Sequence, residues 1–100
     1  MEIRYSKELT DYLRGRKKRN ISIEVASSDH SDFDVTELYV RLVDDSFADY
    51  LIEKKRYRAF PAEEGRLLLP PYHLELSEEI CLDIRKVLWF HRITYTGVAL

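Results

Sequence analysis

The sequence predicts a single small α+β domain over residues 1–100, with one N-terminal helix and mostly short antiparallel or mixed strands. Three observations lead to this prediction. The length of 100 residues is that of one domain, and 45% hydrophobic residues provide enough apolar surface for one modest core. Segments in which apolar and polar residues alternate outnumber the one segment with clear helical spacing. No internal repeat and no linker divides the chain.

A short strand and a helix are expected at the N-terminus. Residues 3–5 form the strand, and Ser6 can cap the helix that follows, whose first turn carries a favourable negative charge. Apolar side chains then recur with the spacing of one helical face, at Leu9, Tyr12 and Leu13. We therefore predict a helix from about Lys7 to Arg14.

Two longer strands follow the helix. Apolar and polar residues alternate over residues 21–25, which predicts a strand with one buried face. The same alternation recurs over residues 36–42. The residues between them, 26–34, are polar turn formers and predict a loop.

The middle of the chain carries weaker signals. Residues 47–52 fit either a helical turn or the start of a strand. Lys54-Lys55-Arg56 is predicted to be the exposed tip of a hairpin, because adjacent cations repel one another, and residues 57–60 would be the returning strand. A turn at 62–65 and a short apolar strand at 67–69 follow, and two prolines end that strand.

The C-terminal region reads as two strands, residues 80–84 and 93–97, joined through residues 85–90. Trp89 and Phe90 are expected to place at least one ring in the core, because an aromatic side chain buries a large apolar area. Cys81 should face away from its neighbours Ile80 and Leu82 and act as a structural thiol.

Charge and cysteine content restrict the possible functions. The chain has 16 Lys and Arg against 18 Asp and Glu, a net charge of −2, which argues against a globally basic nucleic-acid binder. No apolar run is long enough to span a bilayer and the N-terminus lacks a signal-peptide pattern, so we expect no membrane partner. A single cysteine cannot form an internal disulfide, so we expect a cytoplasmic location.

Two segments are candidate sites. Asp29, His30 and Asp32 could bind a divalent metal or iron weakly, although the same residue types are common in ordinary loops. The basic run Arg16, Lys17, Lys18 and Arg19 could bind an acidic partner or phosphate, although the dipole of the preceding helix also favours cations there. No aromatic side chain is interleaved in that run for base stacking.

Enzymatic motifs are missing from the sequence. It contains no nucleophile elbow, and its three glycines are too far apart to form a phosphate-binding loop. A metal-dependent hydrolase built from His30, Asp32 and Asp34 is a further alternative, but it would need a pocket that joins them. We therefore expect a protein that is not an enzyme.

A family resemblance rests on two segments. The first is the strand-then-helix opening from Ile3 to Leu13, and the second is Leu82-Asp83-Ile84-Arg85-Lys86-Val87-Leu88-Trp89-Phe90 followed by residues 93–97. In this pattern the chain resembles the HesB/IscA-like family, the A-type iron–sulfur carriers. The resemblance implies a HesB-like fold and a link to iron–sulfur or metal metabolism.

The cysteines that bind the cluster in that family are absent here. The resemblance places one ligand in the loop that contains residues 28–31, where only His30 could replace a cysteine. The Cys-Gly-Cys of standard members has no counterpart, and Cys81 matches no family ligand. Because clusters select thiolate ligands, the resemblance implies a degenerate member without cluster ligands of its own.

The sequence therefore predicts a non-enzymatic binding or accessory module with no resident cofactor, apart from a weakly bound divalent metal or iron. A protein partner is expected, and a homodimer would help so small a domain to fold. The alternative is a nucleic-acid-binding module that uses the basic segments 14–19 and 54–58. Strong salt dependence of binding would identify it.

Overall fold

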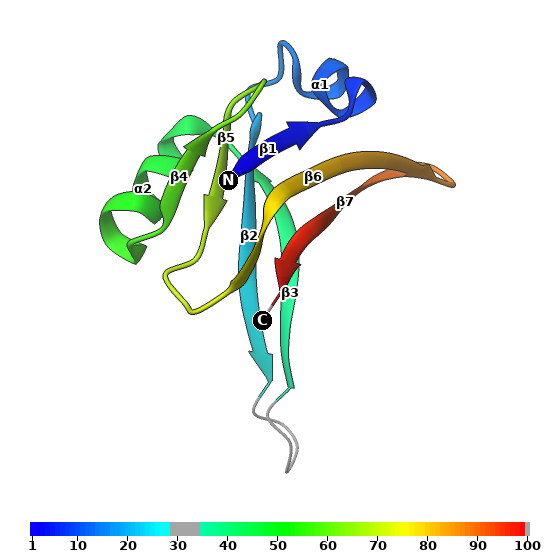
Figure 1. Ribbon diagram of the computed structural model, residues 1–100. Helices are drawn as coiled ribbons and strands as arrows, with labels where there is room; N and C mark the ends of the chain where they lie inside the picture. Colours follow the sequence, from blue (N-terminus) through cyan, green and yellow to red (C-terminus); the bar gives the residue numbers. More distant parts are fainter. Residues whose placement is uncertain (29–34, 100) are drawn as a thin grey trace.

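Two β-sheets and two helices make up the part of the chain that the computed structural model describes, residues 1–28 and 35–99 (Figure 1). This arrangement confirms the predicted α+β class. The elements in chain order are β1 (Glu2–Tyr5), α1 (Lys7–Leu13), β2 (Asn20–Ser28), β3 (Val35–Val43), α2 (Asp45–Lys55), β4 (Arg58–Pro61), β5 (Arg66–Leu69), β6 (Glu75–Val87) and β7 (Phe90–Ala99).

Both sheets are mixed, as predicted. The smaller sheet has the order β1-β6-β7, in which β1 is parallel to β6 and β7 is antiparallel to it. The larger sheet has the order β3-β2-β5-β4, in which only the β2–β5 pair is parallel. Pro61 is tolerated at the end of β4 because β4 is an edge strand and proline cannot donate into a ladder.

The predicted helix at the N-terminus is confirmed as α1. The Ser6 hydroxyl accepts a hydrogen bond from the backbone N–H of Leu9 at 3.1 Å, which is the expected N-cap. The helix ends at Leu13, one residue earlier than predicted, because Arg14 adopts an extended backbone conformation. Gly15 follows with a φ of 77°, in the left-handed region that favours glycine.

A second helix, α2, corrects the prediction of a single helix. The Asp44 carboxylate caps it by accepting from the Phe47 backbone N–H at 2.8 Å. Lys54 and Lys55 lie in its last turn, where cations are favourable, and Arg56 closes it in the left-handed conformation. The prediction of a hairpin tip at these three residues was therefore wrong.

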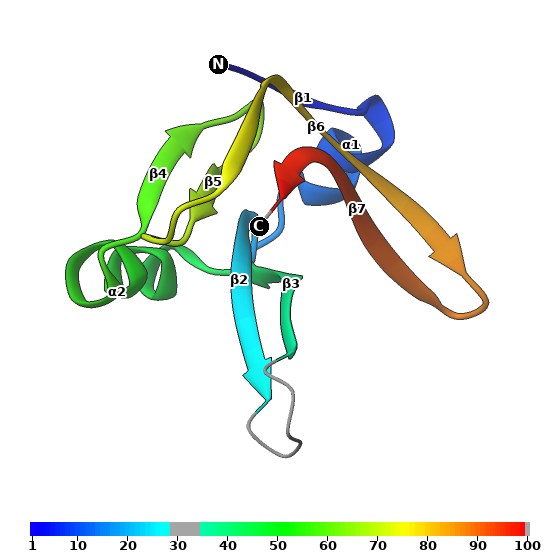
Figure 2. The same ribbon diagram turned by 60° about the horizontal axis from the view of Figure 1, so that its bottom comes forward.

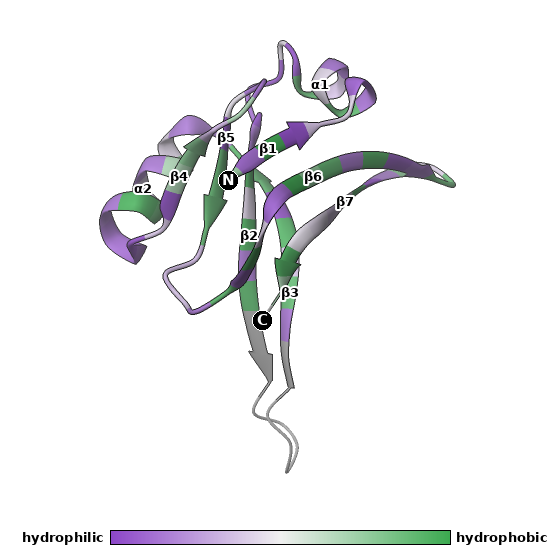
Figure 3. Ribbon diagram, in the orientation of Figure 1, coloured by the Kyte–Doolittle hydropathy of each residue, from purple (hydrophilic) through white to green (hydrophobic). Residues whose placement is uncertain are grey.

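The main core lies between the two sheets. Its side chains come from β2, β5 and β6, and from the inner face of α1; among them Leu9, Leu13, Ile21, Ile23, Leu67, Leu69 and Ile80 are fully buried. A second small cluster joins Leu68 to Ala48 and Leu51 of α2. Strand β5 is therefore covered on both faces, which explains its uninterrupted apolar run (Figure 3).

Strand β2 is also buried on both faces, which corrects the prediction of a single buried face. Ser22 and Glu24 alternate with the core isoleucines, yet they are 0% and 6% exposed. Helix α2 contacts β2 and lies over this second face. The strand also runs to Ser28, so the first residues of the predicted 26–34 loop belong to β2.

The C-terminal hairpin is longer than predicted. Strands β6 and β7 stay paired out to Val87 and Phe90, so only Leu88 and Trp89 form the turn. Ile84 and Ile93 still pack against the core, whereas residues 85–92 are exposed. The end of the hairpin extends away from the body of the domain, and we call it the arm (Figures 1 and 2). Trp89 and Phe90 are 85% and 48% exposed, so the prediction that at least one ring is in the core was wrong.

Candidate interaction surface

The predicted metal loop, with Asp29, His30 and Asp32, lies outside the described residues and stays a prediction. Within residues 1–28 and 35–99, no three His, Cys, Asp or Glu side chains lie close enough together to hold a metal ion. Cys81 faces away from the core, as predicted, and its thiol donates to Glu79 Oε1 at 3.1 Å. That hydrogen bond raises the pKa of Cys81, which disfavours the thiolate that a soft metal needs.

The predicted basic run occupies the loop between α1 and β2, and all four of its side chains are exposed. Arg16 folds back on α1: its Nε donates to the Tyr12 carbonyl at 2.8 Å, and its guanidinium lies 3.8 Å from the Tyr12 ring centroid. Arg19 lies 3.6 Å from the carboxylate of Asp45. The run therefore forms local contacts within the domain as well as an exposed basic surface.

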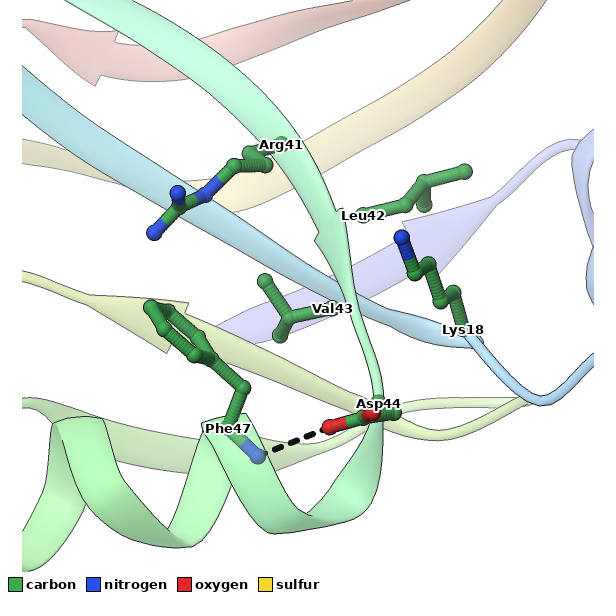
Figure 4. Close-up of a pocket in the computed structure, with 6 residues that line it drawn as sticks. All are labelled: Lys18, Arg41, Leu42, Val43, Asp44 and Phe47. Atoms are coloured by element: carbon green, nitrogen blue, oxygen red, sulfur yellow. Dashed lines mark hydrogen bonds between the residues drawn. The ribbon is translucent and has the colours of Figure 1, made fainter.

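Lys18 lines a small cavity beside the start of α2 (Figure 4). The volume is about 220 Å³, below the range of roughly 300–1,000 Å³ that is typical of ligand pockets. One wall is the helix cap itself, in which Asp44 accepts from Phe47, and Arg41 lies at another wall. We therefore interpret this cavity as part of the helix cap rather than a ligand site.

The largest exposed apolar group in the described part of the chain is the end of the arm. We call residues Val87–Phe90 the tip. Val87 is 39% exposed, Leu88 73%, Trp89 85% and Phe90 48%. Four consecutive large apolar residues on a protruding turn are unusual for a surface that contacts only water, and such patches mark binding sites.

Directly behind the tip, two cross-strand pairs of basic residues form what we call the collar. Arg85 is paired with Arg92 on one face of the hairpin, and Lys86 with His91 on the other. Among the described residues, none of these four side chains forms an ion pair. The sequence also contains no Asp or Glu from Ile84 onward. The three cations Arg85, Lys86 and Arg92 therefore have no ion-pair partner in the described chain. Like charges directly opposite each other, as in the Arg85–Arg92 pair, also destabilise a hairpin.

Helix α1 supports one side of the arm. The His91 ring packs against Tyr12 of α1 in a tilted arrangement, with ring centroids 4.8 Å apart and an angle of 44° between the ring planes. The Ser6 hydroxyl, at the start of α1, donates to the Asp83 carboxylate of β6 at 2.6 Å. This hydrogen bond lowers the pKa of Asp83, so the carboxylate stays ionised and the contact persists at neutral pH. The tip is therefore presented on a fixed support.

A groove of about 460 Å³ lies between β3 and β7, next to the arm. Its walls carry aromatic and aliphatic side chains together with two residues of the collar: Leu38, Tyr39, Val40, Leu42, Phe90, His91, Arg92, Ile93 and Tyr95. No carboxylate is among these lining residues. The tip, collar and groove thus form one apolar and positively charged region.

A buried carboxylate lies on the other side of the larger sheet. Glu24 contacts Arg41 through both oxygens, at 2.8 Å from Nε and 3.0 Å from Nη2, and the Arg41 guanidinium lies over the Phe47 ring. Burial, with Glu24 as a second cause, raises the pKa of nearby Tyr57 to about 12. Because Arg41 neutralises Glu24 internally, we interpret this pair as structural.

The exposure of the tip was not predicted, because large aromatic side chains in a turn between strands usually pack into the core. A signal was present: the apolar run Val87–Phe90 is flanked by Arg85-Lys86 and His91-Arg92, and it lacks the Gly or Asn expected in a tight turn. Leu88 takes the required left-handed conformation instead, with a φ of 55°. A strained, exposed leucine points to a role outside folding.

Comparison with known proteins identifies no relative of this chain. No protein-family model, curated protein or solved structure matches this chain significantly. Within the described residues, no helix has the length and apolarity needed to cross a bilayer.

Proposed function

We propose that this chain is a non-enzymatic binding module that docks onto an anionic partner through the tip and collar of the β6–β7 arm. The observation that carries the proposal is the exposure of Leu88 and Trp89, at 73% and 85%, directly in front of three cations, Arg85, Lys86 and Arg92, that have no ion-pair partner in the described chain. Contact with an anionic partner would remove the apolar side chains from water and compensate the collar.

Three energetically unfavourable features coincide at the tip and collar. Fully burying a side chain such as leucine contributes about 1.5–3 kcal/mol, which the free protein forgoes at the tip. Leu88 holds a conformation that costs a non-glycine residue about 1–2 kcal/mol. Arg85 and Arg92 repel each other across the hairpin. Folding alone gives no reason to keep all three features together, whereas binding does.

Heparin, a sulfated polyanion, provides a test of the charge component. The sequence pI of about 5.9 predicts that the protein as a whole is repelled at neutral pH, so retention on a heparin column requires a local basic surface. We expect wild type to be retained and released by salt. The double variant Arg85→Ser/Arg92→Ser keeps the basic loop but should elute at clearly lower salt than wild type. The matched variant Lys54→Ser/Lys55→Ser, which removes two exposed cations from α2, should elute with wild type.

Two results would contradict the proposal: wild type that is not retained, or equal loss of retention in both double variants. Circular dichroism should show that all variants are folded. Removing the Arg85–Arg92 repulsion is not expected to destabilise the hairpin.

Single-stranded nucleic acid is a second candidate for the anionic partner. The Tyr12 ring contacts both the Arg16 guanidinium and the His91 ring, so the tertiary structure brings an aromatic ring to the basic loop that lacked one in sequence. The groove adds Tyr39, Phe90 and Tyr95. The second basic segment, 54–58, belongs to the α2 end of the domain, away from the arm in both views, so it is not continuous with this region (Figures 1 and 2).

A HesB-like ancestry, with a link to iron–sulfur metabolism, stays a proposal that the residue pattern of β6 and β7 supports. A carrier function would need a site shared between chains, because Cys81 is the single cysteine of the sequence. Elemental analysis and acid-labile sulfide in protein purified anaerobically test this link. If metal is present, His30→Ala should abolish its uptake without unfolding the protein; metal uptake that survives this change would exclude the 29–32 loop as the site.

A further inference from the structure

The side chains of the arm are arranged in layers along its length. Leu88 and Trp89 form the outermost layer, with Val87 and Phe90 beside them, and the collar lies directly behind. Figure 3 shows the same order, hydrophilic colour followed by hydrophobic colour at the far end of the arm. A lipid bilayer has the matching order, since charged headgroups surround an apolar interior.

We propose that the anionic partner of the tip is the surface of a bilayer that contains acidic lipids, a step that rests on the function proposed above. The tip enters the headgroup region while the collar stays at the level of the lipid phosphates. Trp89 is the residue type that favours this interface, because its ring is apolar and its indole N–H can still reach water.

The dimensions of the arm support this depth. Leu88 lies three positions beyond Arg85, which at ~3.3 Å per position is ~10 Å. Interfacial elements of proteins typically enter the bilayer by ~5–10 Å. An arm of this length therefore buries its apolar end without removing the collar from the headgroups.

The charge distribution along β6 orients the domain. Glu75, Glu78 and Glu79 lie at one end of this 13-residue strand, and Arg85 and Lys86 lie at the other. A domain with a net charge of −2 can then approach an anionic surface with its basic end first.

Two other occupants fit the tip less well. A second copy of this chain could offer its groove, but Arg92 lines that groove and would face the like-charged collar. Single-stranded nucleic acid could stack on Trp89 and Phe90, but it would leave the exposed aliphatic side chains of Val87 and Leu88 without an apolar partner. The expectation of no membrane partner rested on the absence of a spanning segment, which interfacial docking does not need.

The test uses the full chain with two kinds of vesicle, phosphatidylcholine alone and phosphatidylcholine mixed with phosphatidylserine. Trp89 is the single tryptophan of the sequence, so its fluorescence reports the tip directly. We expect co-sedimentation and a blue shift of the emission with the acidic vesicles only, and release by high salt.

Three variants locate the binding surface. Each cation near an anionic membrane contributes a factor of roughly five to binding, so the loss of two in Arg85→Ser/Arg92→Ser should weaken binding roughly 25-fold. Lys54→Ser/Lys55→Ser is the matched control, and its binding should equal that of wild type. Leu88→Ser should reduce both co-sedimentation and the blue shift while circular dichroism stays unchanged.

The outcomes separate this inference from the function on which it rests. If the arm is needed for binding to heparin or to an oligonucleotide but the protein does not bind acidic vesicles, the bilayer is not the partner. The proposed function as a binding module would then still hold. Equal loss in the α2 control variant would show that the arm is not the membrane contact. Failure to bind vesicles, heparin and oligonucleotide would overturn both proposals.

Discussion

Replacing Leu88 with glycine should make the protein more stable, although it removes a large apolar side chain. Leu88 has a φ of 55°, and the left-handed conformation costs leucine about 1–2 kcal/mol. Glycine avoids that cost but loses about 0.5–1 kcal/mol through the entropy of its unfolded state. Because Leu88 is 73% exposed, little buried contact is lost. The midpoints of these two ranges leave a net gain of about 0.5–1 kcal/mol.

Thermal unfolding followed by circular dichroism measures this gain. In a domain of this size, a gain of about 0.5–1 kcal/mol raises the melting temperature by about 2–8 °C. Leu88→Ala is the matched control, because it removes the same side-chain contacts but keeps a Cβ in the left-handed conformation. If the glycine variant is no more stable than the alanine variant, the argument from backbone strain at the tip is refuted.

Three further predictions follow from the body of the domain. Arg41→Ala leaves the buried Glu24 carboxylate unpaired and should lower the free energy of unfolding in urea by about 1.5–3 kcal/mol; a change below the error of the measurement would show that the pair is not structural. The pKa of Asp83 is lowered in the folded state, chiefly by the hydrogen bond that its carboxylate accepts from Ser6. The ionised carboxylate therefore stabilises the folded protein above the unfolded pKa of about 3.9, and this stabilisation is lost as the pH falls through the lower folded pKa. Asp83→Asn should therefore flatten the loss of stability in acid, and an unchanged acid profile would contradict this. Gly97→Ala places a Cβ 2.5 Å from a backbone oxygen and should cost about 1–3 kcal/mol more than Gly15→Ala, which shares the positive φ but meets open space; equal melting temperatures would refute the clash.

Much of the fold could be predicted from local patterns. Ser6 followed by apolar residues at helical spacing predicts α1, because a cap and one apolar stripe are properties of a single segment. Alternation predicts β2 and β3 in the same way. The outward orientation of Cys81 could also be predicted, because successive side chains of a strand point to opposite faces and its neighbours Ile80 and Leu82 are apolar.

The tertiary structure decided which faces are covered. Glu24 alternates like a solvent-facing residue but is buried, because α2 packs over the second face of β2. The apolar run of β5 identifies an element but not the helix that covers its outer side at Leu68. Such coverage depends on segments far apart in the chain, and no local period encodes it.

The candidate site follows the same division. The sequence by itself determined where the basic residues and the apolar run Val87–Phe90 lie, because composition and spacing are read directly from the chain. It could not determine that this run is exposed. An aromatic pair in a turn is buried only if another element reaches it, and here the hairpin extends beyond the helix and the second sheet. Burial is a property of the whole packing arrangement, so only the tertiary structure distinguishes a core residue from an exposed contact.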